Sequence, residues 1–431
     1  MAATDVASIA TELDSATERD HERDFSELAG RLDRAGCDAE EVIAAVHHFE
    51  VALPSWAFAT GGTRFGRFPG VGEPHTLREK MEDAALVHRL TASAPRLSLH
   101  IPWDEVRDIN EVLADARRLG IGFDAVNSNT FQDQPNQPLS YKLGSFSNPD
   151  PAVRRQAIEH HLHVIEVGKL VGSKALSVWL ADGADFPGQM SLRGSFERVG
   201  ECLREVYAAI PDDWRLFTEH KPYEPAFYAT VVQDWGSSLL LAQSLGERAQ
   251  CLVDLGHHLP STNIELVVAR LLGAGKLGGF HFNDSMYGDD DLTAGSIKPY
   301  ALFLIFHELV QAERERLPGF DPAYMIDQSH NLKDPIEALL QTVDQLQQSY
   351  AKACLVDHDE LVAHQESGDV IMAERTLKRA YDTDVRPLVA EARRRRGAAL
   401  DPVLAFRASG HRARKAAERP AALASGARTH L

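Results

Sequence analysis

Eight short apolar runs recur along this 431-residue chain, and each ends in polar or aromatic residues. The runs are residues 51–56, 96–103, 122–129, 174–180, 215–221, 251–258, 278–285 and 324–330. Segments with helical periodicity alternate with them, at 74–93, 104–119, 151–172, 192–209, 224–245, 261–274, 297–314 and 333–353. Eight strand-then-helix units predict an α/β fold, a parallel sheet closed into a (β/α)8 barrel, with the active site at the carboxyl ends of the strands.

The barrel predicted from this alternation takes up residues 51–355, and helical extensions precede and follow it. Residues 1–50 have the pattern of two amphipathic helices, and residues 356–431 form a C-terminal helical extension and tail, helical over 357–397. The Ala/Arg-rich stretch 407–431 lacks a core pattern. We therefore expect that stretch to be peripheral, partly disordered or used in subunit contacts.

A glycine-rich loop spans residues 60–75 and carries Phe65 and Phe68. No GK[ST] motif follows it, so the loop is not predicted to bind phosphate. We expect it to be a lid or an arm that reaches the cavity mouth of a neighbouring subunit, where Phe65 would contact substrate.

The net charge of −18 disfavours a nucleic-acid or anionic-membrane partner, because phosphate surfaces need a concentrated basic patch. No apolar run approaches the roughly 20 residues of a membrane span, and the acidic N-terminus is unlike a signal peptide. The four cysteines are scattered without a CxxC pair. These features predict a cytoplasmic protein with reduced thiols.

Metal-competent side chains gather at the last four strand ends. They are Glu219, Asp254, His257, His281, Asp284, Asp289, Asp291 and Asp327. Four such ends converge only if the strands are parallel neighbours, so the pattern predicts a metal site built on strand ends. Carboxylates mixed with imidazoles and no thiolate favour Mn2+, Mg2+ or Co2+, and are compatible with Zn2+.

The spacing of these ligands favours two ions. Asp254 and His257 are three residues apart across a strand-to-loop turn, which lets the carboxylate bridge two ions while the imidazole reaches one. Asp289 and Asp291 are spaced to bind one ion from the same side, although a solvated turn is the alternative for this acidic run. A bridging carboxylate between two ions is the arrangement that steadies vicinal oxygens.

Glu219 and Lys221 alternate on one strand and are expected to point to the same side, which puts a carboxylate beside an ammonium. The functional interpretation is a metal ligand beside a cation that polarises substrate. The alternative is a buried salt bridge.

Indoles and amides end the remaining strands and predict a sugar-binding wall. They are Trp56, His100, Trp103, Asn127, Asn129, Phe131, Trp179 and Asp182. Flat aromatic faces with interspersed hydrogen-bonding groups suit the apolar faces and hydroxyls of a sugar, and tryptophans as core residues are the alternative. Ser329, which follows Asp327, is assigned to substrate binding as well.

Long stretches of the chain resemble L-rhamnose isomerases of the type related to xylose isomerase. The matching strings include TGGTRFGRFPG, SLHIPW, FDAVNSNTF, WLADGADFPGQ, LFTEHKPYEPAFY, CLVDLGHH, GGFHFNDSMYGDDD and MIDQSHN. The resemblance implies a homotetramer with two divalent cations per chain, typically Mn2+, and aldose–ketose interconversion. It covers essentially the whole chain.

Residue by residue, the resemblance implies one ion on Glu219, Asp254, His281 and Asp327. A second ion is implied on the shared Asp254 with His257, Asp289 and Asp291. Lys221 would contact the O1/O2 end of the open-chain sugar, and His100 would assist ring opening. Xylose isomerase relatives pair that histidine with an aspartate three residues on, whereas Trp103 occupies this position here and Asp104 follows it.

Two chemical routes are compatible with these residues: hydride transfer between C2 and C1, or proton transfer through an enediol. Lys221 and the metal ions favour polarisation with a hydride shift, and Asp327 with a water would support the proton route. Two other classes remain as alternatives. One is a different metal-dependent barrel, such as a ketose 3-epimerase or a phosphodiester-cleaving enzyme, and the other is a non-catalytic sugar-binding protein with structural metals.

Overall fold

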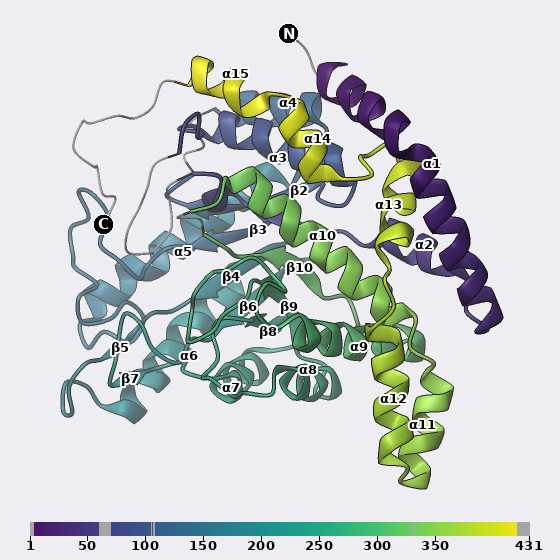
Figure 1. Cartoon of the computed structure of the whole chain (residues 1–431). Coiled ribbons are helices and arrows are strands. Elements are labelled where there is room, and N and C mark those ends of the chain that lie inside the picture. The colour runs from purple at the N-terminus through teal and green to yellow at the C-terminus, as the bar shows by residue number, and fades with distance from the viewer. Residues whose placement is uncertain (1–3, 60–69, 105, 107, 330–331, 420–431) are drawn as a thin grey trace.

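Eight parallel strands close into one barrel in the computed structural model, which describes residues 4–59, 70–104, 106, 108–329 and 332–419, with the backbone alone for 4–16. The order around the barrel is β1–β10–β9–β8–β6–β4–β3–β2. The strands are β1 (Ala52–Pro54), β2 (Arg96–Ile101), β3 (Gly122–Ser128), β4 (Ala175–Trp179), β6 (Arg215–Glu219), β8 (Ala249–Asp254), β9 (Leu277–Phe282) and β10 (Ala323–Ile326). Each predicted run overlaps one barrel strand, which confirms the (β/α)8 fold (Figure 1).

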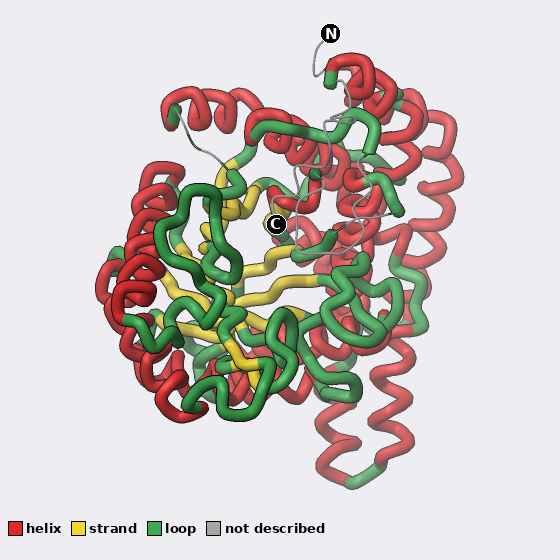
Figure 2. The backbone as a smooth tube through the Cα atoms, turned by 90° about the vertical axis from the view of Figure 1, so that its left-hand side faces the viewer, coloured by secondary structure: helices red, strands yellow, loops and turns green. Residues whose placement is uncertain are grey.

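Helices surround the strands on the outside of the barrel (Figure 2). They are α3 (Leu77–Thr91), α4 (Ile109–Leu119), α5 (Pro151–Val171), α6 (Leu192–Ala209), α7 (Trp235–Leu245), α8 (Ile264–Gly273), α9 (Pro299–Glu315) and α10 (Pro335–Cys354). Local sequence sets their first turns: Thr76 and Glu79 form a reciprocal capping box at α3, and Asp234 caps α7.

The fifth predicted helix is shorter in the structure than the sequence predicted. A helix was expected over 224–245, but α7 begins only at Trp235. Glu224 has a positive φ of 71°, which is outside the helical region, and Pro225 disfavours a helical conformation at the residue before it. Instead β7 (Ala229–Thr230) pairs antiparallel with β5 (Gly183–Ala184) in a small separate sheet.

Side-chain alternation along the strands divides the barrel interior into an apolar layer and a polar layer. The apolar layer consists of Ala52, Ala125, Ala175, Phe217, Leu252 and Met325. Two residues further along the same strands come Asn127, Ser177, Glu219, Asp254 and Asp327. Because side chains two apart share a face, the polar layer lies directly above the apolar one at the carboxyl ends.

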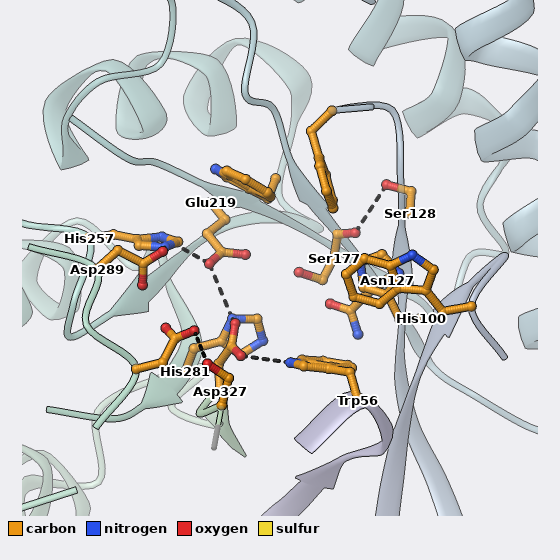
Figure 3. A pocket seen from close by; sticks show the side chains of 15 residues that line it. Trp56, His100, Asn127, Ser128, Ser177, Glu219, His257, His281, Asp289 and Asp327 are labelled. Atoms are coloured by element: carbon orange, nitrogen blue, oxygen red, sulfur yellow. Dashed lines mark hydrogen bonds and ion pairs between the residues drawn. The ribbon is translucent and has the colours of Figure 1, made fainter. Parts of the chain in front are cut away.

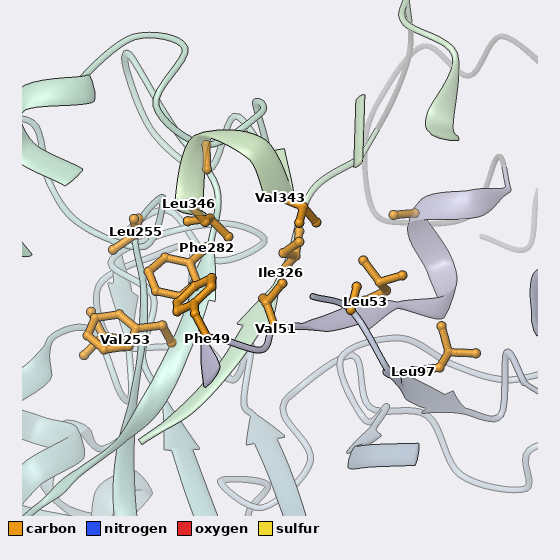
Figure 4. Close-up of a cluster of buried hydrophobic side chains, with 14 of the residues drawn as sticks. Phe49, Val51, Leu53, Leu97, Val253, Leu255, Phe282, Ile326, Val343 and Leu346 are labelled. Atoms are coloured by element: carbon orange, nitrogen blue, oxygen red, sulfur yellow. The ribbon is translucent and has the colours of Figure 1, made fainter. Parts of the chain in front are cut away.

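Apolar side chains on the opposite faces of the strands pack against the helices. Leu53 and Ile326 point outward from β1 and β10, and Val343 and Leu346 of α10 lie over them with Phe49 (Figure 4). All five side chains are at most 3% exposed. This packing fixes the strand ends that carry the site.

Helices extend both ends of the barrel, as the sequence predicted. α1 (Thr4–Arg34) and α2 (Ala39–His48) precede it, whereas α11 (His358–Ser367), α12 (Val370–Tyr381) and α13 (Arg386–Arg395) follow it. α11 and α12 project as a hairpin at the lower right of Figure 1. α1 contacts α13, so the two extensions pack together, and their separation into domains at 50/51 and 355/356 stays a prediction. Within the described residues, none of the helices combines the length and apolar composition of a bilayer span.

The start of the C-terminal tail is helical, although its sequence has no core pattern. α14 (Pro402–Ala408) and α15 (His411–Glu418) lie against the barrel, and the Arg419 side chain is 2% exposed. Arg419 Nη1 donates to Asp83 Oδ2 of α3 at 2.8 Å and to the carbonyl of Gly72 at 3.3 Å. Residues 407–419 have no core pattern in the sequence because polar side chains, not an apolar stripe, anchor this segment, and its use in subunit contacts stays a prediction. Residues 420–431 lie outside the described residues.

The Arg419–Asp83 ion pair should contribute strongly to stability. Removing one partner of a buried pair leaves the other charge uncompensated, so we expect Arg419→Met to lower the free energy of unfolding by about 3 kcal/mol in chemical denaturation. The matched control is Arg407→Met, whose exposed pair with Glu337 should contribute about 0–1 kcal/mol. Equal losses in the two variants would contradict a structural role for the Arg419 pair.

Candidate metal centre

The polar layer of the barrel brings four of the predicted ligands to one point. Ligand atoms of Glu219, Asp254, His281 and Asp327 all lie within 4.8 Å of one another. His281 Nδ1 is 3.2 Å from Glu219 Oε1, 3.8 Å from Asp254 Oδ2 and 3.7 Å from Asp327 Oδ2. Parallel register explains the meeting, because Asp254 of β8 pairs with His281 of β9. Glu219, His281 and Asp327 point toward one another in Figure 3, and the four residues lie close enough together to hold one metal ion.

A second group shares Asp254 with the first. Ligand atoms of Asp254, His257 and Asp289 also lie within 4.8 Å of one another. His257 Nε2 is 3.5 Å from Asp289 Oδ2, and its Nδ1 is 3.1 Å from Glu219 Oε1. Asp254 therefore occupies the geometric position that a bridging carboxylate needs.

The polar atoms of Asp254 fit a cation. Its Oδ1 accepts hydrogen bonds from Gly256 N at 2.8 Å and Asn283 Nδ2 at 2.9 Å, which fix the carboxylate. Its Oδ2 is fully buried and has no hydrogen-bond partner among the described residues. A buried unpaired carboxylate oxygen is costly unless a cation or donor meets it. The donor set of oxygens and imidazole nitrogens suits Mn2+ or a similar ion.

The electrostatics of the first group point the same way. Burial raises the pKa of Asp254 to about 7, and neighbouring carboxylates act in the same direction. Burial would lower the pKa of His281, but Glu219, Asp327 and Asp254 outweigh it and raise that pKa to about 9. Several carboxylates therefore lie close together at this point, and a bound cation would reduce the repulsion between their charges.

Two of the eight metal-competent side chains lie outside both groups. Asp291 lines the same cavity, has a positive φ of 47°, and accepts a hydrogen bond from Ser329 Oγ at 3.1 Å. Its assignment to the second ion stays a prediction. Asp284 accepts from the backbone N–H groups of Ile297 at 2.7 Å and Lys298 at 2.9 Å, just before α9. Asp284 therefore holds the backbone that precedes α9 and does not complete either group.

Lys221 is not among the residues that line the cavity, and its contact with substrate stays a prediction. β6 ends at Glu219, so the alternation does not continue to Lys221. The Lys221 ammonium is 2.6 Å from Asp289 Oδ2 and 3.2 Å from Glu224 Oε2, and it lies 4.9 Å from the centre of the Trp179 ring. Burial opposes its charge, but Asp289 and Glu224 outweigh burial and raise the pKa of Lys221. The side chain therefore stays cationic and holds Asp289.

Aromatic side chains form the other half of the cavity. Trp56, His100, Trp103, Phe131 and Trp179 line it, together with Asn127, Ser128, Ser177, Asp291 and Ser329. His100 stacks on Trp103 with ring centres 3.9 Å apart, and Phe131 lies 4.6 Å from Trp179. These contacts give a continuous aromatic wall opposite the carboxylates (Figure 3).

Two residues predicted for this wall are not among the residues that line the cavity. Asp182 accepts hydrogen bonds from Ser145 and Ser147 and so holds the loop after β3. Asn129 follows the end of β3 and is 1% exposed, and its backbone N–H donates to His160 Nε2 at 3.0 Å. Sequence reasoning missed Ser177, although its position two residues before Trp179 on β4 gives it the same inward face.

Among the described residues, no carboxylate is hydrogen-bonded to the His100 imidazole. Burial lowers its pKa to about 3, so the ring is neutral. Its Nδ1 has no hydrogen-bond partner among the described residues. Asp104 instead accepts from the His100 backbone N–H at 2.8 Å and from Lys80 Nζ at 2.7 Å. The Phe65 contact lies outside the described residues.

Comparison with known proteins identifies the family. No protein-family model matches the chain. It is 56% identical over 415 residues to a probable sugar isomerase of Mesorhizobium japonicum, covering 96% of both chains. It is 28% identical over 251 residues to the xylose isomerase of Thermus thermophilus, covering 53% of this chain and 62% of that one. The solved structure of an L-ribulose 3-epimerase has a TM-score of 0.52 at 16% identity, over 72% of this chain and 98% of that one, which is a likeness of fold.

A closed parallel barrel with carboxylates and imidazoles gathered at its carboxyl ends defines the class of fold and of candidate site. The chain belongs to the sugar isomerase family that includes the Mesorhizobium protein.

Proposed function

We propose that this protein is a metal-dependent aldose–ketose isomerase that interconverts L-rhamnose and L-rhamnulose, with a substrate range that includes D-allose and D-psicose. One observation carries the proposal: two ligand groups share Asp254 and face an aromatic wall across one cavity. The resemblance to L-rhamnose isomerases supports the choice of substrate. It also supports a cytoplasmic homotetramer.

Each ligand group would hold one divalent cation, Mn2+ by preference and otherwise Co2+, Zn2+ or Mg2+. Glu219, Asp254, His281 and Asp327 would hold the first, and Asp254, His257, Asp289 and Asp291 the second. Bound cations would supply Lewis-acid stabilisation of negative charge on vicinal sugar oxygens.

The protein's own residues would orient the open-chain sugar. In the aldose-to-ketose direction hydrogen moves from C2 to C1, while the hydroxyl proton at O2 passes to O1. The Lys221 charge would favour electron density on O1 and O2, and this suits transfer of hydrogen as hydride. Asp327 lines the cavity and would accept or return the hydroxyl proton, whereas the neutral His100 would face the ring oxygen during ring opening. Trp56, Phe131, Trp179 and Ser329 would contact the carbon chain and its hydroxyls.

A turnover panel tests the proposal. L-rhamnose, L-mannose, L-lyxose and D-allose are assayed with the EDTA-treated protein and after addition of each metal. We expect EDTA to abolish isomerisation, Mn2+ or Co2+ to restore it, and L-rhamnose to give L-rhamnulose. A ketose changed only at C3 would identify an epimerase instead, and sugar binding without turnover would identify a binding protein. With 2-deuterated aldose, label retained at C1 supports hydride transfer.

The aromatic wall gives a second expectation. Trp179→Ala should lower kcat/KM for L-rhamnose about tenfold, or about 1.4 kcal/mol, through lost contact with the sugar face. Trp235→Ala is the control, because Trp235 lies on α7 and does not line the cavity. Steady-state kinetics at equal metal content measures the effect. Parent-like turnover by Trp179→Ala would make that indole a core residue.

A further inference from the structure

We propose that Trp56 is a positioning residue for the metal ligand Asp327, and that the buried carboxylate of Asp104 holds Trp56 in place from behind. The sequence offered Trp56 only as sugar wall or core. The inference rests on the proposed function in one respect, namely that Asp327 binds a divalent cation.

The two carboxylate oxygens of Asp327 have different neighbours, and only one of them contacts Trp56. Trp56 Nε1 donates to Asp327 Oδ1 at 2.8 Å (Figure 3). Asp327 Oδ2 lies 3.7 Å from His281 Nδ1, on the side of the first ligand group. An indole N–H on one oxygen restricts rotation of the carboxylate and so fixes where the other oxygen points. Hydrogen bonds of this kind orient metal ligands and strengthen binding.

The Asp327 side chain is less tightly packed than the other ligands of the first group, so a hydrogen bond matters more for its orientation. Asp327 is the first residue after β10, which ends at Ile326, and its backbone N–H donates to the carbonyl of Phe282 of β9 at 3.2 Å. Its side chain is 23% exposed, whereas those of Asp254 and His281 are 0% and 2% exposed. Close packing immobilises the buried ligands. The more exposed carboxylate depends on a specific hydrogen bond.

Asp104 fixes the segment that carries Trp56. Ser55, the residue before Trp56, donates its hydroxyl to Asp104 Oδ2. The His100 N–H donates to the same oxygen at 2.8 Å, and Lys80 Nζ of α3 is 2.7 Å from Oδ1. The Asp104 side chain is 0% exposed. One carboxylate therefore ties the end of β1, the end of β2 and helix α3 together.

This arrangement excludes a second role for Asp104 in the structure as it stands. Asp104 would polarise the His100 imidazole if its carboxylate accepted a hydrogen bond from a ring N–H. Its oxygens accept instead from a hydroxyl, a backbone N–H and an ammonium, while His100 Nδ1 has no partner among the described residues. Asp104 acts on the cavity through the positions of Ser55 and Trp56.

Trp179 provides a matched control for the indole. It lines the same cavity as Trp56, but its Nε1 has no hydrogen-bond partner among the described residues. Replacing either tryptophan by phenylalanine keeps an aromatic ring and removes the N–H. Only in Trp56→Phe does the change remove a bond to a metal ligand.

The test is Mn2+ binding to the metal-free full-length protein, measured by titration calorimetry. We expect Trp56→Phe to weaken Mn2+ affinity by about 10- to 100-fold, the usual effect of removing an orienting hydrogen bond. Trp179→Phe should change that affinity by less than about twofold, because its N–H orients no ligand. Equal affinities of parent and Trp56→Phe overturn the inference. A parent that binds no Mn2+ overturns the proposed metal-dependent function as well.

A second pair of variants tests the contribution of Asp104 without altering an aromatic ring. Ser55→Ala removes the hydroxyl that Asp104 holds, and Ser98→Ala removes a buried hydroxyl on β2 that has no partner among the described residues. We expect Ser55→Ala to weaken Mn2+ affinity about three- to tenfold, which is less than the loss expected when a residue that bonds directly to a ligand is changed. Ser98→Ala should leave the Mn2+ affinity unchanged. Equal affinity of the two variants would remove Asp104 from the proposal. It would leave the Trp56 contact to stand on its own test.

Discussion

Asp254→Ala should bind neither of two Mn2+ ions and should isomerise L-rhamnose at least 10,000-fold more slowly than the parent, about 5.4 kcal/mol of transition-state stabilisation. The reason is geometric. Asp254 is the one residue present in both ligand groups of the described structure, and its Oδ2 has no hydrogen-bond partner there. Elemental analysis after gel filtration measures the metal content, and steady-state kinetics measures the loss.

Two single-ligand variants control for the Asp254 result. Glu219 belongs only to the first group, and Asp289 only to the second. Glu219→Ala and Asp289→Ala should therefore each retain about one ion per chain, because the other group keeps its ligands. If Asp254→Ala retains two tightly bound ions, Asp254 is not a bridge. If all three variants lose both ions, the two groups depend on each other and are not separable sites.

Side-chain alternation explains why the sequence alone predicted so much of this cavity. A closed parallel barrel places all carboxyl strand ends at one rim, and every second residue faces inward. Glu219, Asp254 and Asp327 lie at or just after such ends, so their convergence followed from the order of apolar runs. The structure brings these residues together with His281 as the pattern required.

Residues beyond the last paired position of a strand were predicted less well. Lys221 and Asp182 follow β6 and β4, where the backbone leaves the barrel and alternation no longer decides direction. Asp182 turns to the loop after β3, and Lys221 turns to Asp289. Loop paths depend on contacts between distant segments, which periodicity does not encode.

Pairings across the barrel were also beyond the sequence. Trp56 and Asp327 are 271 residues apart, and an indole at a strand end is compatible with core, wall or donor roles. Only the closure of the barrel, which pairs β1 with β10, brings them within hydrogen-bonding distance. The folded start of the tail depends in the same way on a distant partner, because Arg419 reaches Asp83 of α3.

The position of Lys221 gives the second large expected effect. Lys221→Met should lower kcat at least 1000-fold, about 4 kcal/mol, if its charge stabilises developing negative charge on the sugar oxygens. A charge that acts only in the transition state lowers kcat and kcat/KM together and leaves KM nearly unchanged. Initial-rate kinetics with L-rhamnose at saturating Mn2+ separates these parameters.

The contacts of Lys221 require a control for a merely structural role, because its ammonium also holds Asp289, a proposed ligand of the second ion. Glu224→Gln removes the other carboxylate contacted by Lys221, at 3.2 Å, and leaves the Lys221–Asp289 pair in place. The kcat of that variant should stay within about tenfold of the parent value, because Lys221 keeps its charge and its closer partner, Asp289. Lys221→Met with parent-like kcat would exclude Lys221 from the reaction. If the loss of kcat disappears at higher Mn2+ concentration, the role of Lys221 is only to hold Asp289. If the loss persists at full metal content, the charge of Lys221 acts on the reacting oxygens.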